Sequence, residues 1–360
     1  MKILFGMPDK NSWGGVQAAE PPFVAAIRKL GVEAREEIYV YGEKANKIML
    51  PQRVDRVLKT ASKFRRVMRA EKFDVVHLNT AFDTKTVLRD LTTVSLIPRG
   101  KTKIFLKLHG SENKLLEDSN RSKQILWRKL LRSVDGIGVL SSEERANFIK
   151  AGIAPDKIFT VKNAVRAPGN LPLRTFAEKP FRLLFVSRFV RTKGLFETCS
   201  AVAKSLENGF DVSLDCLGDG EERERVEQQF ADLSDKIRFH GYVAEETVDK
   251  FYQQSDALVF PTRHAEGFPM VIFNAMAHGL PIITTKIRAM ADYLTEPKNC
   301  LWTMTDKNSE NLCQKIDSLY QNKDLCQQMS MNNCALANEF APENVAREFF
   351  AIYQKLLETK

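Results

Sequence analysis

Residues 261–281 read PTRHAEGFPMVIFNAMAHGLP, and they decide the fold because they combine a strand end, a turn and a short capped helix. The four apolar residues before them, 257–260, predict a buried strand. Pro269 suits the first turn of a helix, and Gly279 suits the left-handed position just past its end. The stretch therefore predicts a strand–turn–helix unit of an α/β protein.

The turn of this unit predicts an anion-binding site. The first backbone N–H groups of a helix have no acceptor within the helix, so they can bind an anion placed at its N-terminus. Pro269 offers no N–H, and Glu266 stands beside the turn. The backbone donors expected here are those of Gly267, Phe268, Met270 and Val271. We expect a phosphate with an attached sugar to bind at this place.

Strand-like and helix-like runs alternate along the whole chain, which predicts parallel sheets covered by helices. In the first half, strands are expected at 2–7, 75–78, 104–108, 136–140 and 157–161, with helices near 18–30 and from Ser142. In the second half, strands are expected at 181–186, 212–217, 236–239 and 257–260, with helices from Leu195 and at 221–230 and 245–254. Two doubly wound domains, 1–165 and 181–341, follow from this pattern, joined by a linker at 166–180 and followed by a helix near 342–357.

The turn and helix resemble a motif of the retaining, nucleotide-sugar-dependent glycosyltransferases of the GT-B fold, family-4 type. That family carries two glutamates eight positions apart around a glycine turn, and here Glu266 stands for the first while Asn274 replaces the second. The resemblance implies two Rossmann-like domains facing a cleft, the first for the acceptor and the second for the donor, with segment 342–360 packing back on the first. It also implies that Glu266 holds sugar hydroxyls and that Asn274 faces the ribose, where an amide offers a neutral hydrogen bond instead of a charged one.

Two cations follow the expected strand 181–186. Arg188 comes directly after the strand, and Lys193 precedes Gly194 at a helix start. A guanidinium fork and an ammonium at a strand end suit a diphosphate, although two solvated surface cations would look the same. In the family that this chain resembles, these positions bind the pyrophosphate and neutralise the leaving group.

Glycine-bearing turns follow the next two strands of the second half. Gly218 begins a Gly-Asp-Gly turn, and Tyr242 and Val243 follow a glycine after the strand at 236–239. Each turn is by itself an ordinary connection. In register with the family, Gly218 would let the backbone approach the donor, and Tyr242 and Val243 would border the base, whose identity the side chains do not reveal.

The first half offers two candidate segments. Gly14 and Gly15 lie between the first strand and its helix, where they allow close approach of a ligand to the backbone, or form a plain flexible loop. His109 follows the strand at 104–108 and resembles the family's histidine that contacts the donor sugar, although a histidine there is also commonly just half-buried. His77 and Asn79 are assigned either a structural or an acceptor-side role.

The net charge of +9 is concentrated in the first half of the chain. Residues 53–72 place eight Lys or Arg side chains among apolar residues at helical spacing, which predicts a basic amphipathic helix. This helix has either an ordinary solvated face or an attraction to an anionic membrane or a lipid-diphosphate acceptor. No nucleic-acid-binding module accompanies it, so we expect no nucleic-acid partner.

Composition narrows the function class further. Neither Cys-x2-Cys nor His-Glu-x-x-His spacing is present, so we expect no metal and no cofactor besides the donor substrate. No apolar run approaches the ~20 residues of a spanning helix and no signal peptide opens the chain, so we expect a cytoplasmic protein, with peripheral attachment to the inner face of the plasma membrane left open.

The expected activity is retaining transfer of a hexosyl unit from a nucleotide-diphosphate sugar to a saccharide or lipid-linked saccharide, in cell-surface polysaccharide or glycolipid synthesis. Two alternatives remain: a nucleotide-sugar epimerase of the same fold, and a non-catalytic binder of a sugar nucleotide or an anionic lipid.

Overall fold

The computed structural model describes residues 1–9, 14–39, 50–110, 116, 120–167, 169, 174–176, 180–264, 266–304 and 309–359. The chain forms two compact units, each built around one parallel sheet. Unit 1 comprises Met1–Val165, Ala265–Phe268 and Phe340–Lys360, and unit 2 comprises Arg166–His264 and Pro269–Glu339.

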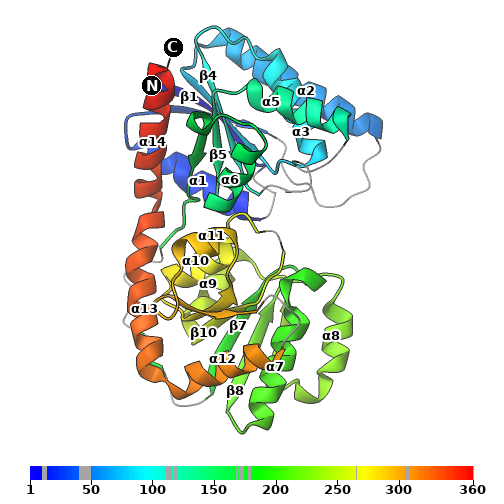
Figure 1. The fold of residues 1–360 in the computed structure, drawn as a ribbon, viewed down its shortest axis with the longest axis vertical. Helices are drawn as coiled ribbons and strands as arrows, with labels where there is room; N and C mark the ends of the chain where they lie inside the picture. The colour runs from blue at the N-terminus through cyan, green and yellow to red at the C-terminus, as the bar shows by residue number, and fades with distance from the viewer. Residues whose placement is uncertain are drawn as a thin grey trace. The chain divides into compact units, whose positions relative to one another are not determined.

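Unit 1 is a six-stranded parallel sheet in the order β2-β1-β3-β4-β5-β6, covered by helices on both faces (Figure 1). The strands are β1 Lys2–Met7, β2 Glu33–Ile38, β3 Val75–Thr80, β4 Lys103–Leu108, β5 Gly136–Val139 and β6 Ile158–Thr160. The helices are α1 Gly15–Arg28, α2 Leu50–Ala70, α3 Thr84–Leu96, α5 Arg121–Arg132, α6 Ser142–Lys150 and α14 Pro342–Glu358. Helices α2, α3 and α5 pack side by side, and α14 packs along α1.

Unit 2 is a second six-stranded parallel sheet, in the order β12-β11-β10-β7-β8-β9. Its strands are β7 Phe181–Val186, β8 Val212–Leu217, β9 Ile237–Gly241, β10 Ala257–Phe260, β11 Ile282–Thr285 and β12 Cys300–Thr303. Its helices are α7 Leu195–Glu207, α8 Arg223–Gln229, α9 Glu245–Gln254, α10 Met270–Ala277, α11 Arg288–Tyr293, α12 Ser309–Gln321 and α13 Lys323–Ala337. The prediction of two doubly wound, Rossmann-like sheets is confirmed.

The strand–turn–helix unit at 257–281 forms as predicted, with one difference at the helix start. Helix α10 begins at Met270, so Pro269 is the residue before the helix rather than part of its first turn. The ψ angle of Pro269 is 100°, which is extended, because the chain must turn there from the loop into the helix. Gly279 takes the left-handed conformation at φ 68°, as expected.

The first helix starts earlier than its sequence suggests. Pro21 and Pro22 indicate a helix start near residue 18, since proline is best tolerated in the first turn. The structure begins α1 at Gly15 and keeps both prolines inside it. The prolines lie in the middle of α1, and Pro22 and Phe23 are buried. Packing of this helix therefore outweighs the hydrogen bonds that the two prolines remove.

Strand β2 was missed because its sequence, EAREEI, is charged. It pairs with β1 at the edge of the sheet and is mostly exposed. Charged side chains are common on edge strands because they discourage pairing with other chains. Arg35 binds Glu71 and Glu37, so the charges of this strand are partly neutralised within unit 1.

Helix α14 belongs to unit 1 through an aromatic cluster. Phe349 lies 4.6 Å from Phe23 of α1 between ring centroids, and Tyr353 lies 5.8 Å from Phe105 of β4. Both side chains are fully buried. The carbonyl of Phe340, just before the helix, accepts a hydrogen bond from the N–H of Val165 at 2.8 Å. The last part of the chain is thus built into the core of the first sheet.

Candidate functional site

The carboxyl edge of the unit 2 sheet carries the two predicted diphosphate-binding cations. The Arg188 side chain is exposed just beyond β7, whereas Lys193 is only 7% exposed. The Lys193 ammonium lies 5.6 Å from the centre of the Phe260 ring, at the end of β10. Gly194 follows in the left-handed conformation at φ 84° and leads into α7. The loop 187–194 therefore places one exposed and one buried cation at the edge where parallel sheets bind ligands.

Glycines hold this loop in place from the neighbouring strand. A Cβ on Gly218 would lie 1.7 Å from the Ser187 carbonyl oxygen, and one on Gly220 would lie 2.5 Å from the Phe189 oxygen. Phe189 also donates its N–H to Asp219 at 2.9 Å. Gly218 was expected to let the backbone approach the donor. In the structure, Gly218 lets the loop that carries Arg188 pack against the end of β8. Its contact with the donor stays a prediction.

The two residues expected to border the base follow β9. Tyr242 is 56% exposed and Val243 is half-buried. Gly241, just before them, takes φ 69°, and a Cβ there would lie 2.8 Å from the Arg223 guanidinium. Tyr242 is thus a large exposed aromatic ring at the carboxyl edge of the sheet, and such a ring suits contact with a planar base.

Asn274 lies on α10 beside a buried tyrosine. Its side chain hydrogen-bonds the Tyr252 hydroxyl, and burial raises the pKa of that tyrosine. The Asn274 carbonyl oxygen accepts a hydrogen bond from Nδ1 of His278 at 2.8 Å. His278 in turn stacks on Tyr252, with ring centres 4.9 Å apart. Asn274 is half-buried, as are Met270 and Val271 in the first turn of the same helix.

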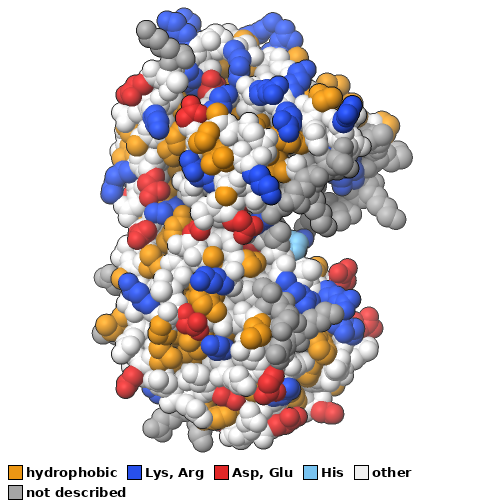
Figure 2. Space-filling view, in the orientation of Figure 1, with side chains coloured by type: hydrophobic (Ala, Val, Ile, Leu, Met, Phe, Trp, Pro, Cys, Tyr) orange, Lys and Arg blue, Asp and Glu red, His pale blue; other side chains and the backbone are white. Residues whose placement is uncertain are grey.

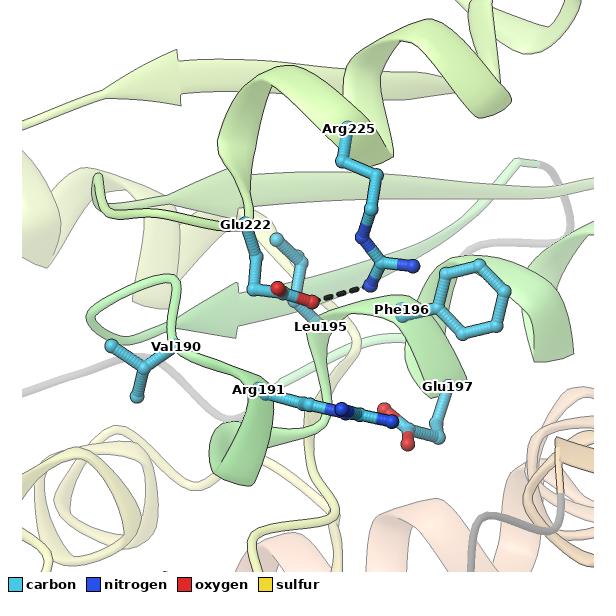
Figure 3. A pocket seen from close by; sticks show the side chains of 7 residues that line it. All are labelled: Val190, Arg191, Leu195, Phe196, Glu197, Glu222 and Arg225. Carbon is cyan, nitrogen blue, oxygen red and sulfur yellow. Dashed lines mark hydrogen bonds and ion pairs between the residues drawn. The ribbon is translucent and has the colours of Figure 1, made fainter.

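A small cavity of about 140 Å³ lies beside the same loop (Figure 3). Arg225 binds Glu222 across it, and its guanidinium lies 5.1 Å from the centre of the Phe196 ring. Ligand pockets usually measure ~300–1,000 Å³, so this cavity is too small for a nucleotide sugar. Neither predicted diphosphate residue lines it; its walls are Val190, Arg191, Leu195, Phe196, Glu197, Glu222 and Arg225.

The carboxyl edge of the unit 1 sheet holds the predicted glycines and a network of buried charges. Gly14 is exposed at φ 120°, and a Cβ there would meet no atom within 4 Å. Its carbonyl accepts the N–H of Ala18 at 3.1 Å, so it starts α1. Gly15 is the first residue of the helix and is also exposed. Among the described residues, nothing fills the space next to Gly14.

Glu20 and Lys107 form an ion pair that is completely buried under this edge. The Lys107 ammonium lies 2.7 Å from Oε1 of Glu20, and neither side chain is exposed. Burial by itself would raise the pKa of Glu20, but Lys107 and two histidines nearby outweigh it and hold that pKa well below its usual range. Burial also lowers the pKa of Lys107, against the attraction of Glu20. Neither charge was predicted from the sequence.

His109 belongs to the same buried network. Its Nε2 lies 2.6 Å from Oδ1 of Asn79 and 3.4 Å from Oε1 of Glu20. Only 3% of its side chain is exposed, and burial lowers its pKa. The contact of His109 with a donor sugar stays a prediction, since the ring is covered in this structure.

His77, whose role was left open, is part of the core. Its Nδ1 lies 2.5 Å from the Tyr353 hydroxyl, and burial lowers its pKa to about 3. It packs between Phe5, Phe23, Phe105 and Phe349. These contacts give His77 a structural role.

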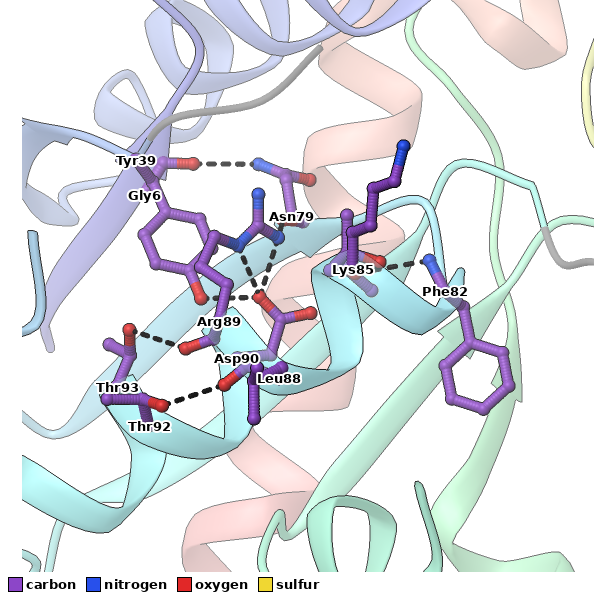
Figure 4. A network of polar contacts seen from close by, with 12 residues as sticks. Gly6, Tyr39, Asn79, Phe82, Lys85, Leu88, Arg89, Asp90, Thr92 and Thr93 are labelled. Carbon is purple, nitrogen blue, oxygen red and sulfur yellow. Dashed lines mark hydrogen bonds and ion pairs between the residues drawn. The ribbon is translucent and has the colours of Figure 1, made fainter. Parts of the chain in front are cut away.

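A second buried charge network adjoins the first through Asn79 (Figure 4). Arg89 donates to the Asn79 carbonyl at 3.1 Å and to Asp90 at 2.6–2.7 Å, and its guanidinium stacks 4.3 Å from the Tyr39 ring centre. The Tyr39 hydroxyl donates to Asp90 at 2.5 Å. Neither network was predicted from the sequence. The available signal was a charge inside an apolar run, as with Lys107 in Ile-Phe-Leu-Lys-Leu.

The turn that carries Glu266 packs within unit 1. A Cβ on Gly267 would lie 2.9 Å from the Gly110 Cα and 3.3 Å from the His109 oxygen. Phe268 lies 5.7 Å from Phe340 between ring centres. The sequence assigned 266–268 to the second domain with the helix that follows. The structure groups these residues with unit 1, because the absent side chain of Gly267 lets the turn rest on the Gly110 backbone.

Among the described residues, no three His, Cys, Asp or Glu side chains are placed so that they could hold a metal ion. The expectation that no metal is needed stays a prediction. Within the same part of the chain, no helix combines the length and the apolar character that crossing a bilayer requires.

Both halves of the chain match glycosyltransferase families. Residues 174–334 match the family described as Glycosyl transferases group 1, and residues 22–167 match Glycosyltransferase Family 4. Each half of the chain is therefore similar to a glycosyltransferase family. The group 1 region contains all strands of the unit 2 sheet, and the Family 4 region contains the strands of the unit 1 sheet except β1. The predicted cations Arg188 and Lys193, Gly218 and α10 lie in the group 1 region.

Proteins similar to this chain include glycosyltransferases named for a biosynthetic route. An amylovoran biosynthesis glycosyltransferase of Erwinia amylovora is 27% identical over 49% of this chain and 40% of its own length. A putative colanic acid biosynthesis glycosyltransferase of Escherichia coli K12 is 24% identical over 80% of this chain and 71% of its own length. The matched stretch spans 37–45% of the length of several other relatives.

The fold is shared with solved structures. Anabaena HepE in complex with UDP-glucose superposes with a TM-score of 0.75 at 16% identity, covering 99% of this chain and 100% of that one. At this identity the likeness concerns the fold alone.

The Gly218 contact can be tested against a matched glycine. Gly218→Ala should lose at least about 3 kcal/mol of stability and weaken nucleotide binding, because a methyl group would collide with the Ser187 carbonyl. Gly209→Ala is the control, since Gly209 also has a positive φ of 85° but open space around it, and it should cost only ~1–2 kcal/mol. Chemical denaturation of the two variants gives the difference, and equal losses would contradict the packing of the loop on β8.

Proposed function

We propose that this chain transfers a hexosyl unit from a nucleotide-diphosphate sugar to a saccharide or lipid-linked saccharide, with retention of configuration. The observation that carries the proposal is the pair of cations after β7, one exposed and one buried, on a loop braced by Gly218 and Gly220. A rigid cationic loop at the carboxyl edge of a parallel sheet suits a diphosphate that gains negative charge as the glycosidic bond breaks.

Different residues of the chain would bind different parts of the donor. Arg188 and Lys193 would neutralise the diphosphate, and the first backbone N–H groups of the α10 turn would add hydrogen bonds to it. Tyr242 and Val243 would border the base, and Asn274 the ribose. Glu266 would hold sugar hydroxyls as a carboxylate acceptor. No metal enters this proposal, because the cations and the helix N-terminus supply the positive charge.

The acceptor class rests on the relatives. Three of them are named for the biosynthesis of amylovoran, colanic acid and a capsular polysaccharide. One solved structure of the same fold was determined with UDP-glucose. We therefore propose an acceptor on the route to a cell-surface polysaccharide or glycolipid, assembled at the cytoplasmic side of the membrane.

A donor panel tests the activity directly. Thermal-shift screening against UDP-, GDP-, ADP- and dTDP-sugars identifies a ligand, and turnover of that donor is then followed by product analysis. Transfer with the starting anomeric configuration supports the proposal, whereas an isomerised donor would identify an epimerase. Binding without any turnover would favour a silent sugar-nucleotide binder, which the amide at Asn274 makes a specific alternative.

Removing either predicted diphosphate cation should reduce donor use. Arg188→Ala and Lys193→Ala should each lower kcat/KM by roughly 10 to 1,000-fold, because each removes positive charge that faces the leaving group. Arg182→Ala is the matched control, since Arg182 is an exposed cation on the same strand, before its carboxyl end. Steady-state kinetics at subsaturating donor measure the effect. Near-wild-type values for Arg188→Ala and Lys193→Ala would end the diphosphate assignment.

Restoring a carboxylate at position 274 should tighten donor binding several-fold. A charged hydrogen bond to the ribose is stronger than a neutral one by about 1 kcal/mol, and the Tyr252 hydroxyl beside Asn274 can donate to the new carboxylate. Asn274→Gln has the same side-chain length as Asn274→Glu without the charge and serves as the control. Calorimetric titration with the preferred donor compares them; weaker binding by the glutamate variant would mean that the pocket is adapted to a neutral group.

A membrane surface is a proposed second partner. Helices α2, α3 and α5 lie side by side, and α5 has five Lys or Arg and no Asp or Glu. Exposed aliphatic side chains stand in the first half of each helix: Val54, Leu58, Leu88 and Ile125. Figure 2 shows Lys and Arg spread over this face of unit 1 with hydrophobic side chains between them. Aliphatic groups framed by cations suit an anionic bilayer, whereas single-stranded nucleic acid would call for exposed aromatic rings.

Vesicle binding tests this surface. Binding should rise with the fraction of anionic lipid and weaken with salt, because the attraction is screened over a Debye length of about 10 Å at 0.1 M. Replacing Val54, Leu58, Leu88 and Ile125 together by serine should reduce it further. Met331→Ser is the control, an equally exposed apolar side chain on unit 2. Equal retention on neutral and anionic vesicles, or none on either, would leave these helices with an ordinary solvated face.

A further inference from the structure

Hydrogen bonds around Asn79 determine which ring nitrogen of His109 carries the proton. Nδ2 of Asn79 lies 3.0 Å from the Gly6 carbonyl oxygen and 3.3 Å from Oε2 of Glu20. Both partners only accept, so the amide nitrogen must face them. Oδ1 of Asn79 then faces Nε2 of His109 at 2.6 Å. Because a carbonyl oxygen only accepts, Nε2 must be the nitrogen that bears hydrogen.

The surroundings of His109 favour its neutral form. Burial and the positive charge of Lys107 lower the pKa of His109, while Glu20 acts in the opposite direction. Lys107 lies closer to Glu20 than His109 does, at 2.7 Å against 3.4 Å, so the lysine is the counter-ion of the carboxylate. The other titratable groups packed around this site are His77 of β3 and Tyr353 of α14. Glu266 precedes Gly267, which rests on the Gly110 backbone.

The backbone of His109 links this buried network to the turn that carries Glu266. Gly267 has no space for a side chain, because a Cβ there would lie 2.9 Å from the Gly110 Cα. Gly110 itself takes φ 144° directly after His109. The backbone of His109 and Gly110 is therefore part of the surface on which the turn rests.

We propose that Glu20, Asn79 and Lys107 are positioning residues that hold His109 neutral, with its proton on Nε2, and thereby fix the Glu266 turn. The inference rests on the proposed function only in the role it gives to Glu266; the protonation state of His109 is independent of it. In the absence of the Lys107 charge, His109 is the nearest basic group to the Glu20 carboxylate. His109 then takes up a proton and replaces Lys107 as the counter-ion of Glu20. The imidazolium then pairs with Glu20, and the turn moves with it.

The protonation state is measured by long-range 1H–15N NMR of the full chain labelled at histidine. The chain has only five histidines, and comparison with His109→Asn identifies the signal. The expected result is the neutral tautomer with the proton on Nε2 between about pH 6 and pH 8. A proton on Nδ1, or a doubly protonated ring in that range, would overturn the proposal, whatever the enzyme's activity proves to be.

Two variants test the role of the ion pair. Lys107→Met should raise the pKa of His109 by about one pH unit or more, because it removes the charge that opposes protonation. The double variant Glu20→Gln/Lys107→Met removes both charges and should return His109 to the neutral form, and it avoids the unpaired buried carboxylate if the single variant folds poorly. An unchanged His109 pKa in Lys107→Met, or a charged His109 in the double variant, would contradict the proposal.

The consequence for Glu266 is read from a pH profile with the donor found by the panel. Lys107→Met should lose kcat/KM at neutral pH and regain part of it as the pH rises above the new His109 pKa, while the double variant, whose His109 stays neutral, should show no such recovery with pH. A loss that is the same at every pH would show mere damage to the core and would overturn the positioning role. If no donor is turned over even by the wild type, the proposed function fails while the NMR result still decides the tautomer.

Discussion

All strands in both sheets run parallel, and the architecture of the site depends on this constraint. In a parallel sheet covered on both faces, the strand interiors must be apolar, and the carboxyl ends of all strands meet along one edge. In unit 2 this edge collects Arg188, Lys193, Gly218 and Tyr242 from three strand ends that lie far apart in the sequence. In unit 1 it collects Gly14 and His109 in the same way. Function can therefore change at the edge without disturbing the core beneath it.

Unit 1 departs from that rule by placing charges inside. The Glu20–Lys107 pair lies between aromatic side chains, with the lysine ammonium 5.1 Å from the Phe349 ring centre. A buried ion pair contributes little net stability, because the loss of hydration offsets the attraction. What it does provide is geometry, since each partner is held by a short directional contact. Asn79 connects the two networks, because it hydrogen-bonds His109 through its side chain and Arg89 of the Arg89–Asp90 pair through its carbonyl.

The two units use glycine for the same physical purpose at different places. Gly218 lets one loop pass close to the end of β8, and Gly267 lets the Glu266 turn rest on Gly110. In both cases the absent side chain brings two backbone segments into contact and so fixes a neighbouring charged residue. The glycines thus act on the site through the position of Arg188 and Glu266, whether or not they also touch a ligand.

The sequence by itself determined the parallel α/β architecture, most strand positions, the helix cap at Gly279 and the candidate cations, because periodicity, capping and strand-end residues are local signals. It missed β2, whose charges follow from its place at a sheet edge, and it placed the start of α1 too late, since packing outweighs the local cost of Pro21 and Pro22. Only the tertiary structure revealed the partners of Lys107, the burial of His109 and the support of the Glu266 turn by Gly110. Asn79 and His109 lie 30 positions apart, and Glu20 and Lys107 lie 87 positions apart, so no local pattern encodes which buried charge meets which.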